Sequence, residues 1–217
     1  MSRNSTVIAR ALLWIAGLEW FAAQAIAQSA WRTPYSLSSN FISDLGAVHC
    51  GTEIGLGYVC SPLHTLMNAS FLVIGVCTVA GVLLLRKKWP RSKSITWGLW
   101  LLGLFGAGKV TVGLAPEDQR LLFHAVGSLG ILFGNIGCLI LAVSLRRTSR
   151  TVALVFLCIG VVGVIAFVLQ LDSALTTIRG ALERLADWPL PLWLAMLGGT
   201  FLAGGEPVGV GLQRGSD

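Results

Sequence analysis

The chain has 217 residues, of which 54% are hydrophobic and only 12% are charged. Soluble domains carry about 25% charged residues, so this chain has too few charges to cover a water-soluble surface. Its net charge of +6 would suit nucleic-acid binding, but the sorting of Lys and Arg across a membrane explains it without a nucleic-acid partner. The composition therefore excludes a soluble domain and indicates an integral membrane protein.

The hydrophobic residues fall into blocks, each about as long as the 20-residue helix that crosses a bilayer. The blocks lack the alternation of a barrel strand, and a spanning segment must satisfy its own backbone hydrogen bonds. We therefore predict an all-α, polytopic fold: one transmembrane domain over residues 1–217, built as a six-transmembrane-helix bundle with a short external helix or lid. The six helices are expected at about 7–28, 62–85, 95–114, 121–145, 151–171 and 188–204.

Lys and Arg concentrate in two short loops between these blocks, RKKWPRSK at 86–93 and RRTSR at 146–150. Short loops rich in Lys and Arg stay in the cytosol. With both loops on the cytosolic side and an even number of crossings, the N- and C-termini are predicted to be cytosolic. The opposite, external side then receives most of the unusual polar residues.

The N-terminal region around the first block resembles a signal peptide, because Arg3 and Arg10 are followed by an apolar stretch and then by Ala25-Ile26-Ala27, which resembles a cleavage site. Glu19 interrupts the apolar stretch, which argues against that interpretation. We therefore interpret this block as a retained first helix.

The external loop at 29–61 contains the segment NFISDLG at 40–46. This pattern predicts a short helix that is capped by Ser39 or Asn40 and ends at Gly46. A loop of this length is usually functional.

Two cysteines, Cys50 and Cys60, lie in the same external loop, on the oxidising side of the membrane. They are predicted to form a disulfide bond. The alternative is that they bind a metal together with the neighbouring His49.

Polar residues open two of the predicted helices on the external side. His64 opens the second helix, and Asn68 follows one turn later on the same face. His124 opens the fourth helix, and Ser128 and Asn135 continue its face inward. Because polar residues inside a membrane usually face the bundle interior, we expect these side chains to meet in an external pocket.

Four charged residues add to this pocket. Glu117 and Asp118 stand just before His124, while Glu19 and Lys109 lie deeper, within the first and third predicted helices. A lone charge at such depth costs at least about 2.5 kcal/mol, so a Glu19–Lys109 ion pair is the simplest prediction. The pair would serve a headgroup site or a proton relay; the alternatives are a structural clamp, or Lys109 reaching outward to the interface.

Residues 172–187 form a second external element, which Asp172 or Ser173 can cap. Its charged residues include Arg179 and Arg184. The pattern favours a short helix in the membrane interface or a lid across the bundle mouth, with a simple connector as the alternative. The apolar residues on its single helical stripe are Leu171, Leu175, Ile178, Leu182 and Leu185.

Five segments carry a family resemblance in their order along the chain: 40–46, 62–64 with Asn68, 113–118, 124–127 and 180–184. Together they resemble a family of bacterial and archaeal membrane proteins known as domain of unknown function 998. The resemblance implies a six-helix fold and a prokaryotic plasma-membrane location, and it implies no established activity.

A looser similarity is to the membrane hydrolase superfamily of alkaline ceramidases and progestin-type receptors, which use a Ser, an Asp and three His around zinc. Ser43, Asp44 and the three histidines of this chain offer the same residue types. The chain departs from that superfamily in having six predicted helices rather than seven, and in lacking paired histidines in the last one.

Three functions follow as hypotheses. The first is an external pocket that binds a membrane lipid, another amphiphile such as a quinone, or a partner membrane protein, with Arg179 and Arg184 reaching an anionic phosphate. The second is a lipid hydrolase in which His64, His124 and Asp44 hold zinc. In it, Glu117 or Asp118 carries protons, and without metal one of the two histidines acts as general base.

The third hypothesis is an ion- or proton-coupled transporter that uses Glu19 and Lys109, although the sequence shows neither an inverted repeat nor a broken helix. A purely structural subunit, as a homo-oligomer or with a partner protein, completes the set.

Overall fold

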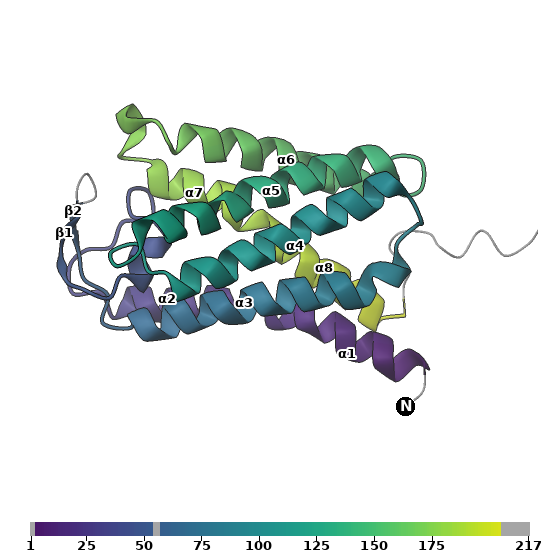
Figure 1. Cartoon of the computed structure of the whole chain (residues 1–217), viewed down its shortest axis with the longest axis horizontal. Helices are drawn as coiled ribbons and strands as arrows, with labels where there is room; N and C mark the ends of the chain where they lie inside the picture. Colours follow the sequence, from purple (N-terminus) through teal and green to yellow (C-terminus); the bar gives the residue numbers. More distant parts are fainter. Residues whose placement is uncertain (1–2, 54–56, 205–217) are drawn as a thin grey trace, which may run out of the picture.

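The computed structural model describes residues 3–53 and 57–204 as a bundle of helices that run along one axis (Figure 1). Four helices are long and apolar enough to cross a membrane, and they make the chain an integral membrane protein. These are α3 (His64–Leu85), α4 (Lys93–Leu114), α5 (Leu121–Leu145) and α6 (Arg150–Leu169). Each lies within two residues of a block expected from the sequence.

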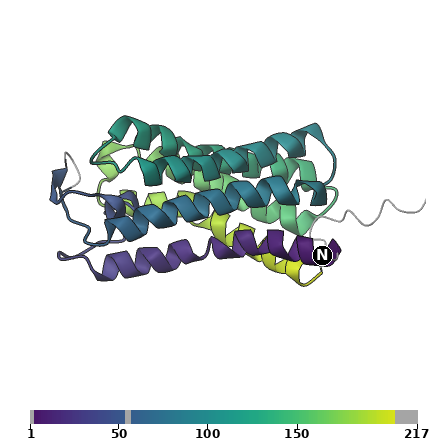
Figure 2. The ribbon, with the colours of Figure 1, turned by 60° about the horizontal axis from the view of Figure 1, so that its bottom comes forward.

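The first block, expected as one helix at 7–28, is an interrupted helix that consists of α1 (Arg3–Ala16) and α2 (Glu19–Ser29). The last block, expected at 188–204, is α8 (Pro189–Leu202), and the short helix expected within 172–187 is α7 (Arg179–Asp187). Only Trp188 separates α7 from α8, so these two form a second interrupted helix. Pro189 explains the second interruption, because proline has no N–H to donate within the helix. Figure 2 shows α1 and α8 side by side, so the two interrupted helices are neighbours.

Glycines bring α4 close to the helices on either side of it. A Cβ on Gly108 would lie 2.3 Å from the carbonyl oxygen of Gly127 on α5, and one on Gly106 would lie 2.8 Å from that of Gly75 on α3. These glycines therefore let the helix backbones approach closely. Gly103 differs, because a Cβ there would meet nothing within 4 Å.

The hydrophobic core has two parts. The larger lies among the long helices and α8 and includes Phe105, Phe156 and Leu190. The smaller surrounds Trp20 on α2 and Phe71 on α3, near the loop that follows α2. It therefore forms the apolar floor beneath that loop.

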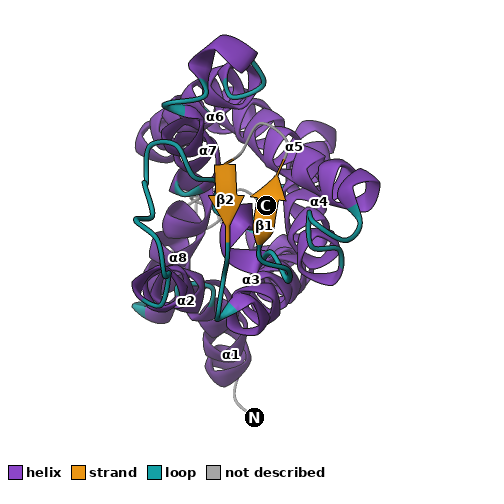
Figure 3. Ribbon diagram, turned by 90° about the vertical axis from the view of Figure 1, so that its left-hand side faces the viewer, coloured by secondary structure: helices purple, strands orange, loops and turns teal. Residues whose placement is uncertain are grey.

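The two ends of the bundle differ. One carries the loop after α2, with the 3-10 helix η1 (Ser43–Gly46) and an antiparallel hairpin of β1 (Gly51–Glu53) and β2 (Gly57–Val59). Figure 3 looks onto this end, where the hairpin lies over the helices. The 3-10 helix η3 (Ser173–Leu175) also belongs to it, and Asp172 caps η3 as expected, accepting a hydrogen bond from the N–H of Ala174. The other end carries η2 (Arg86–Lys88) and the described ends of α1 and α8 (Figure 1).

Candidate functional site

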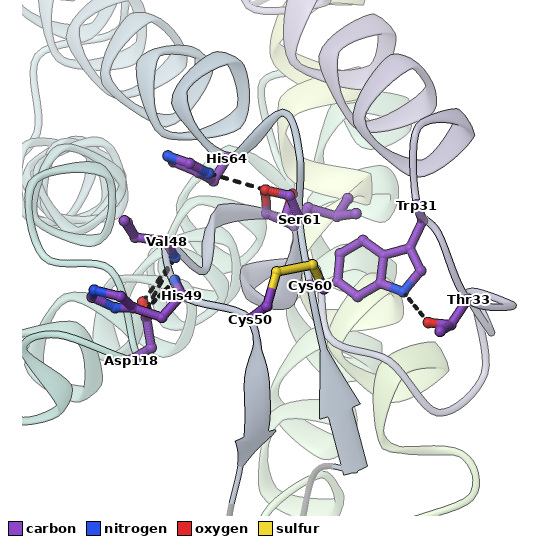
Figure 4. The surroundings of a disulfide bond; sticks show 10 residues. Trp31, Thr33, Val48, His49, Cys50, Cys60, Ser61, His64 and Asp118 are labelled. Carbon is purple, nitrogen blue, oxygen red and sulfur yellow. Dashed lines mark hydrogen bonds and ion pairs between the residues drawn. A yellow bond between two sulfur atoms is a disulfide. The ribbon is translucent and has the colours of Figure 1, made fainter.

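The base of the β-hairpin is closed by the predicted disulfide between Cys50 and Cys60 (Figure 4). Because both sulfurs are used in this bond, the alternative of a metal pair with His49 is wrong. The ring Nδ1 of His49 instead lies 2.9 Å from a carboxylate oxygen of Asp118.

Asp118 fastens the hairpin to the loop between α4 and α5. Its carboxylate accepts hydrogen bonds from the backbone N–H groups of Val48 (3.0 Å) and His49 (2.8 Å) (Figure 4). Burial alone would raise the pKa of Asp118, but these hydrogen bonds to the charged form outweigh it and lower the pKa. Asp118 is therefore a fixed anion and suits neither acid catalysis nor proton transfer at neutral pH.

The NFISDLG segment is a turn stabilised by Asp44, and not the longer helix expected from its sequence. The Asp44 carboxylate accepts hydrogen bonds from the side-chain amide of Asn40 (2.9 Å) and the N–H of Phe41 (3.0 Å). The 3-10 helix begins only at Ser43, so neither Ser39 nor Asn40 is its cap.

Gly46 is required for close approach and not for a left-handed backbone. A Cβ at Gly46 would lie 2.4 Å from the side-chain oxygen of Asn68. The Asn68 amide donates to the Gly46 carbonyl at 2.8 Å. Asn68 therefore attaches the loop to α3 and does not line a pocket.

Asp44 and Glu117 form a buried pair of carboxyl groups. Each of these carboxyls acts on the pKa of the other, and the Ser43 hydroxyl acts on that of Glu117. Burial raises the pKa of Asp44. Burial first, and then the charge of Asp44, raise the pKa of Glu117 well above its usual value. Two adjacent carboxyls that cannot both ionise easily make this pair a proton-binding site.

His124 lies beside this pair. Its Nδ1–H donates to the carbonyl of Ala115 at 2.9 Å, which leaves Nε2 at 3.9 Å from a Glu117 oxygen. Ser128, one turn further, donates its hydroxyl to the His124 carbonyl. His124 thus belongs to the site, whereas Ser128 satisfies its own helix.

The charged side chains of α7 face the bundle. Glu183, Arg184 and Asp187 are at most 9% exposed, whereas Leu185 and Ile178, the residue before the helix, are 50% and 43% exposed. The predicted apolar stripe is divided, because Leu182 is buried in the core while Ile178 and Leu185 face outward. The carboxylate of Glu183 accepts a hydrogen bond from the N–H of Ile42.

Arg184 holds the loop after α2 and is not open to a phosphate. Its guanidinium donates to the carbonyls of Leu37 (3.0 Å), Asn40 (2.8 Å) and Gly180 (2.8 Å), and to the hydroxyl of Tyr35 (2.6 Å). The site predicted at Arg184 is therefore occupied by the chain's own backbone.

Arg179 also contacts the loop. Its Nε–H donates to the carbonyl of Ser39 at 3.2 Å, and its guanidinium lies 4.8 Å from the ring centre of Phe41.

The predicted Glu19–Lys109 ion pair is wrong. Lys109 pairs with Asp187 at the end of α7, and both side chains are buried. Glu19 instead accepts a hydrogen bond from Ser70 at 3.0 Å and occupies the first turn of α2, where the helix dipole favours a negative charge.

An aromatic cage surrounds the Lys109 ammonium. It lies 4.4, 5.3 and 5.4 Å from the ring centres of Trp20, Phe71 and Phe105. Cation–π attraction and the Asp187 carboxylate together offset the cost of burying this charge.

Asn135 connects α5 to the interruption between α7 and α8. Its amide donates to the carbonyl of Ala186 at 2.8 Å, which is close to the point where Pro189 removes a helical donor. The side chain faces α6 at Gly163, where any Cβ would overlap it. Asn135 therefore holds the broken helix in place.

The zinc site predicted at His64, His124 and Asp44 does not fit these residues. The Nδ1–H of His64 donates to the carbonyl of Ser61 at 3.0 Å and closes the turn before α3 (Figure 4). Residues 3–53 and 57–204 contain no group of three or more His, Cys, Asp or Glu side chains arranged to hold a metal ion.

The contacts therefore define one polar cluster at the hairpin end, buried beneath the loop after α2. The sequence analysis did not identify Glu183 and Asp187 as site residues. The charged residues concentrated at 172–187 were a signal for them, because the rest of the chain is so apolar. We use the name polar cluster for Ser43, Asp44, Lys109, Glu117, His124, Glu183 and Asp187.

The fold and this cluster define the class: an α-helical integral membrane protein with buried ionisable groups gathered at one end. A family model described as "Protein of unknown function (DUF998)" matches residues 15–200, so the chain belongs to that family. The segments that carried the resemblance contain five of the seven residues of the polar cluster; Lys109 and Asp187 lie outside them. No curated protein and no solved structure matches the chain, and the looser hydrolase similarity gains no support.

Proposed function

We propose that the chain crosses the membrane six times, with α1–α2 and α7–α8 each crossing as one interrupted helix. At about 1.5 Å per residue, residues 3–29 and 179–202 extend roughly 35–40 Å, which is enough for a core of about 30 Å. The basic loops at 86–93 and 146–150 support a cytosolic location for the end opposite the hairpin. Both termini then lie in the cytosol, and the polar cluster lies near the external surface.

We further propose that the polar cluster binds the headgroup of a membrane lipid or similar amphiphile. One observation carries this proposal: the cluster and its neighbour Asn135 contain buried acceptor oxygens without donors. Among the described residues, four such oxygens have no hydrogen-bond partner: Asp44 Oδ1, Glu117 Oε1, Asn135 Oδ1 and Asp187 Oδ1. Such atoms are costly to bury, and a ligand that brings donors relieves that cost.

The chemistry of these atoms selects the ligand. Carboxylate and amide oxygens accept hydrogen bonds, and the guanidinium of Arg184, the strongest nearby donor, is used by the loop. The proposed headgroup therefore carries N–H or O–H donors, as a primary ammonium or a sugar does. For the headgroup to enter, the loop after α2 must move aside, because this loop covers the polar cluster.

The test compares dioleoyl phosphatidylethanolamine with dioleoyl phosphatidylcholine on delipidated protein, by native mass spectrometry. The two headgroups differ only in methylation of the ammonium, so only the first can donate. We expect roughly tenfold tighter binding of phosphatidylethanolamine, because a hydrogen bond to a charged group contributes about 1.5–3 kcal/mol. Glu117→Gln should reduce this preference, and Arg120→Gln, an exposed neighbour, should leave it unchanged.

The acidity of the carboxyl pair gives this binding a pH dependence. Because the pKa of Glu117 is raised, its carboxyl stays protonated to a higher pH than an ordinary glutamate does. While it is protonated, the pair offers less negative charge to an ammonium. Binding should therefore tighten as the pH rises through the pKa of the pair, and Glu117→Gln should flatten this profile. Equal binding of the two lipids at every pH would overturn the proposal.

Proton-coupled transport is the second candidate, and the interrupted helices favour it. Glu19 follows the interruption of the first helix, and Asp187 precedes that of the last, as ionisable groups do in many transporters. Proton flux in vesicles that is lost in Glu19→Gln would favour this candidate over simple binding. Hydrolysis is not proposed, because the described residues assemble neither a metal site nor an activated nucleophile.

A further inference from the structure

A second candidate site lies at the opposite end of the bundle. A groove of about 1190 Å³ is lined by residues of α3, of α4 and of the connection between them. Figure 1 shows that this connection lies at the end of the bundle opposite the β-hairpin. The mouth of the groove is lined by four cationic side chains, those of Arg86, Lys87, Arg91 and Lys93.

The charge of this mouth is not balanced by the residues that the structure describes. Residues 54–116 contain no Asp or Glu. In the part of the chain that the structure describes, none of the four cationic side chains forms an ion pair. Their combined charge is therefore available to an anion from outside the protein.

The groove continues into an apolar part that lies deeper along the helices. This part has a volume of about 170 Å³ and shares Leu83, Trp100 and Leu104 with the basic mouth. Val79 and Gly103 lie further along it, and it is lined only by apolar side chains and glycine. The two parts form one groove that is cationic at the bundle end and apolar toward the membrane interior.

We infer that this groove binds an anionic phospholipid, with the phosphate among the cations of the α3–α4 connection and an acyl chain along the apolar part. Basic pockets between transmembrane helices bind anionic headgroups in this way. Trp97 and Trp100, which are 66% and 52% exposed, line the same groove and are suited to the interface between headgroup and acyl chain.

The apolar part distinguishes a lipid from a soluble anion. A free phosphate needs only the basic mouth, whereas a phospholipid fills both parts. Gly103 makes this difference testable, because a Cβ there would meet nothing within 4 Å. Leucine at this position should fit the fold and occupy the space of the acyl chain.

The experiment measures binding of dioleoyl phosphatidylglycerol and dioleoyl phosphatidylcholine to delipidated protein by native mass spectrometry. We expect wild type to prefer phosphatidylglycerol by roughly tenfold or more, since each cation near an anionic surface adds to the attraction. Changing Lys87, Arg91 and Lys93 to Gln together should abolish the preference. Gly103→Leu should weaken phosphatidylglycerol binding by about fivefold or more, because it removes apolar area from the ligand contact.

The matched control is Gly199→Leu on α8. A Cβ at Gly199 would also meet nothing within 4 Å, and this residue does not line the groove. The control should bind as wild type does. Equal affinities for the two lipids would overturn the inference, as would Gly103→Leu binding like Gly199→Leu. Competition by soluble glycerol phosphate at the lipid's own concentration would show a simple anion surface and would also overturn it. The glycine pair decides the question even if the triple variant fails to fold.

Discussion

Replacing Lys109 with alanine is expected to destabilise the protein more than any other single loss of charge in the described chain. The change leaves the Asp187 carboxylate buried, without its cation, beneath Trp20 and Phe71. Removing one partner of a buried ion pair costs about 3–5 kcal/mol. We expect a lower midpoint of thermal unfolding in detergent and a loss of folded protein from the membrane.

Two further measurements separate the charge of Lys109 from its volume. Propylammonium supplies the atoms that Lys109→Ala removes, so it should raise the unfolding midpoint of this variant and not that of wild type. Adding Asp187→Asn to Lys109→Ala should recover part of the stability, because the unpaired charge is then absent. If Lys109→Ala unfolds at the same temperature as the control Thr111→Ala on the same helix, the ion pair does not stabilise the fold.

Replacing Arg184 with glutamine is expected to release the loop that covers the polar cluster. The guanidinium is the donor for three carbonyls and for the Tyr35 hydroxyl, and it is 6% exposed. Loss of these charge-assisted bonds should cost about 3 kcal/mol or more, since each unpaired buried acceptor carries its own penalty. Hydrogen exchange should accelerate in residues 35–46, where Ile42 is buried.

Arg184→Lys should restore only part of the protection, because a lysine cannot reproduce the planar arrangement of donors. Arg120→Gln, an exposed change at the same end of the bundle, is the control and should leave exchange unchanged. Unaltered exchange in Arg184→Gln would mean that the loop is held by other contacts, such as the disulfide and Asp118.

The long helices were predictable because their signals are local. Hydrophobic blocks bounded by Arg and Lys clusters placed α3 to α6 within two residues of their observed ends. The interruptions in the first and last helices were not recognised, because hydropathy averages over a window and passes across Gly17 or Pro189 without a gap. Pro189 also lies at the start of the helix expected at 188–204, where proline is common, so it gave no sign of an interruption.

The polar site was only partly predictable, because partner choice depends on helix depth and rotation. Glu117 and His124 were expected in one place, and the structure brings them together with Asp44. Lys109 was assigned to Glu19 because residues 172–187 were interpreted as lying outside the bundle, which hid Asp187 from consideration. Once α7 is placed inside, the lysine has a nearer and more deeply buried partner.

Polar loop residues were the other source of error. Asn68, His64 and Asp118 were interpreted as ligands, whereas each bonds a nearby backbone group and fixes the loop. A backbone that leaves a helix in the membrane must find partners for its N–H and C=O groups. The sequence shows which residues are polar but not which of them serve the backbone.

The most direct test of the proposed headgroup site is to identify the molecule that the polar cluster binds. Purified wild-type protein should be extracted with organic solvent and any released amphiphile quantified by mass spectrometry, beside Glu117→Gln and the surface control Arg120→Gln. We predict that wild type and control release about one molecule per chain more of an amphiphile with an N–H or O–H headgroup than Glu117→Gln does, in addition to any lipid held by the basic groove. Equal amounts in all three proteins, or only amphiphiles without such donors, would contradict the account.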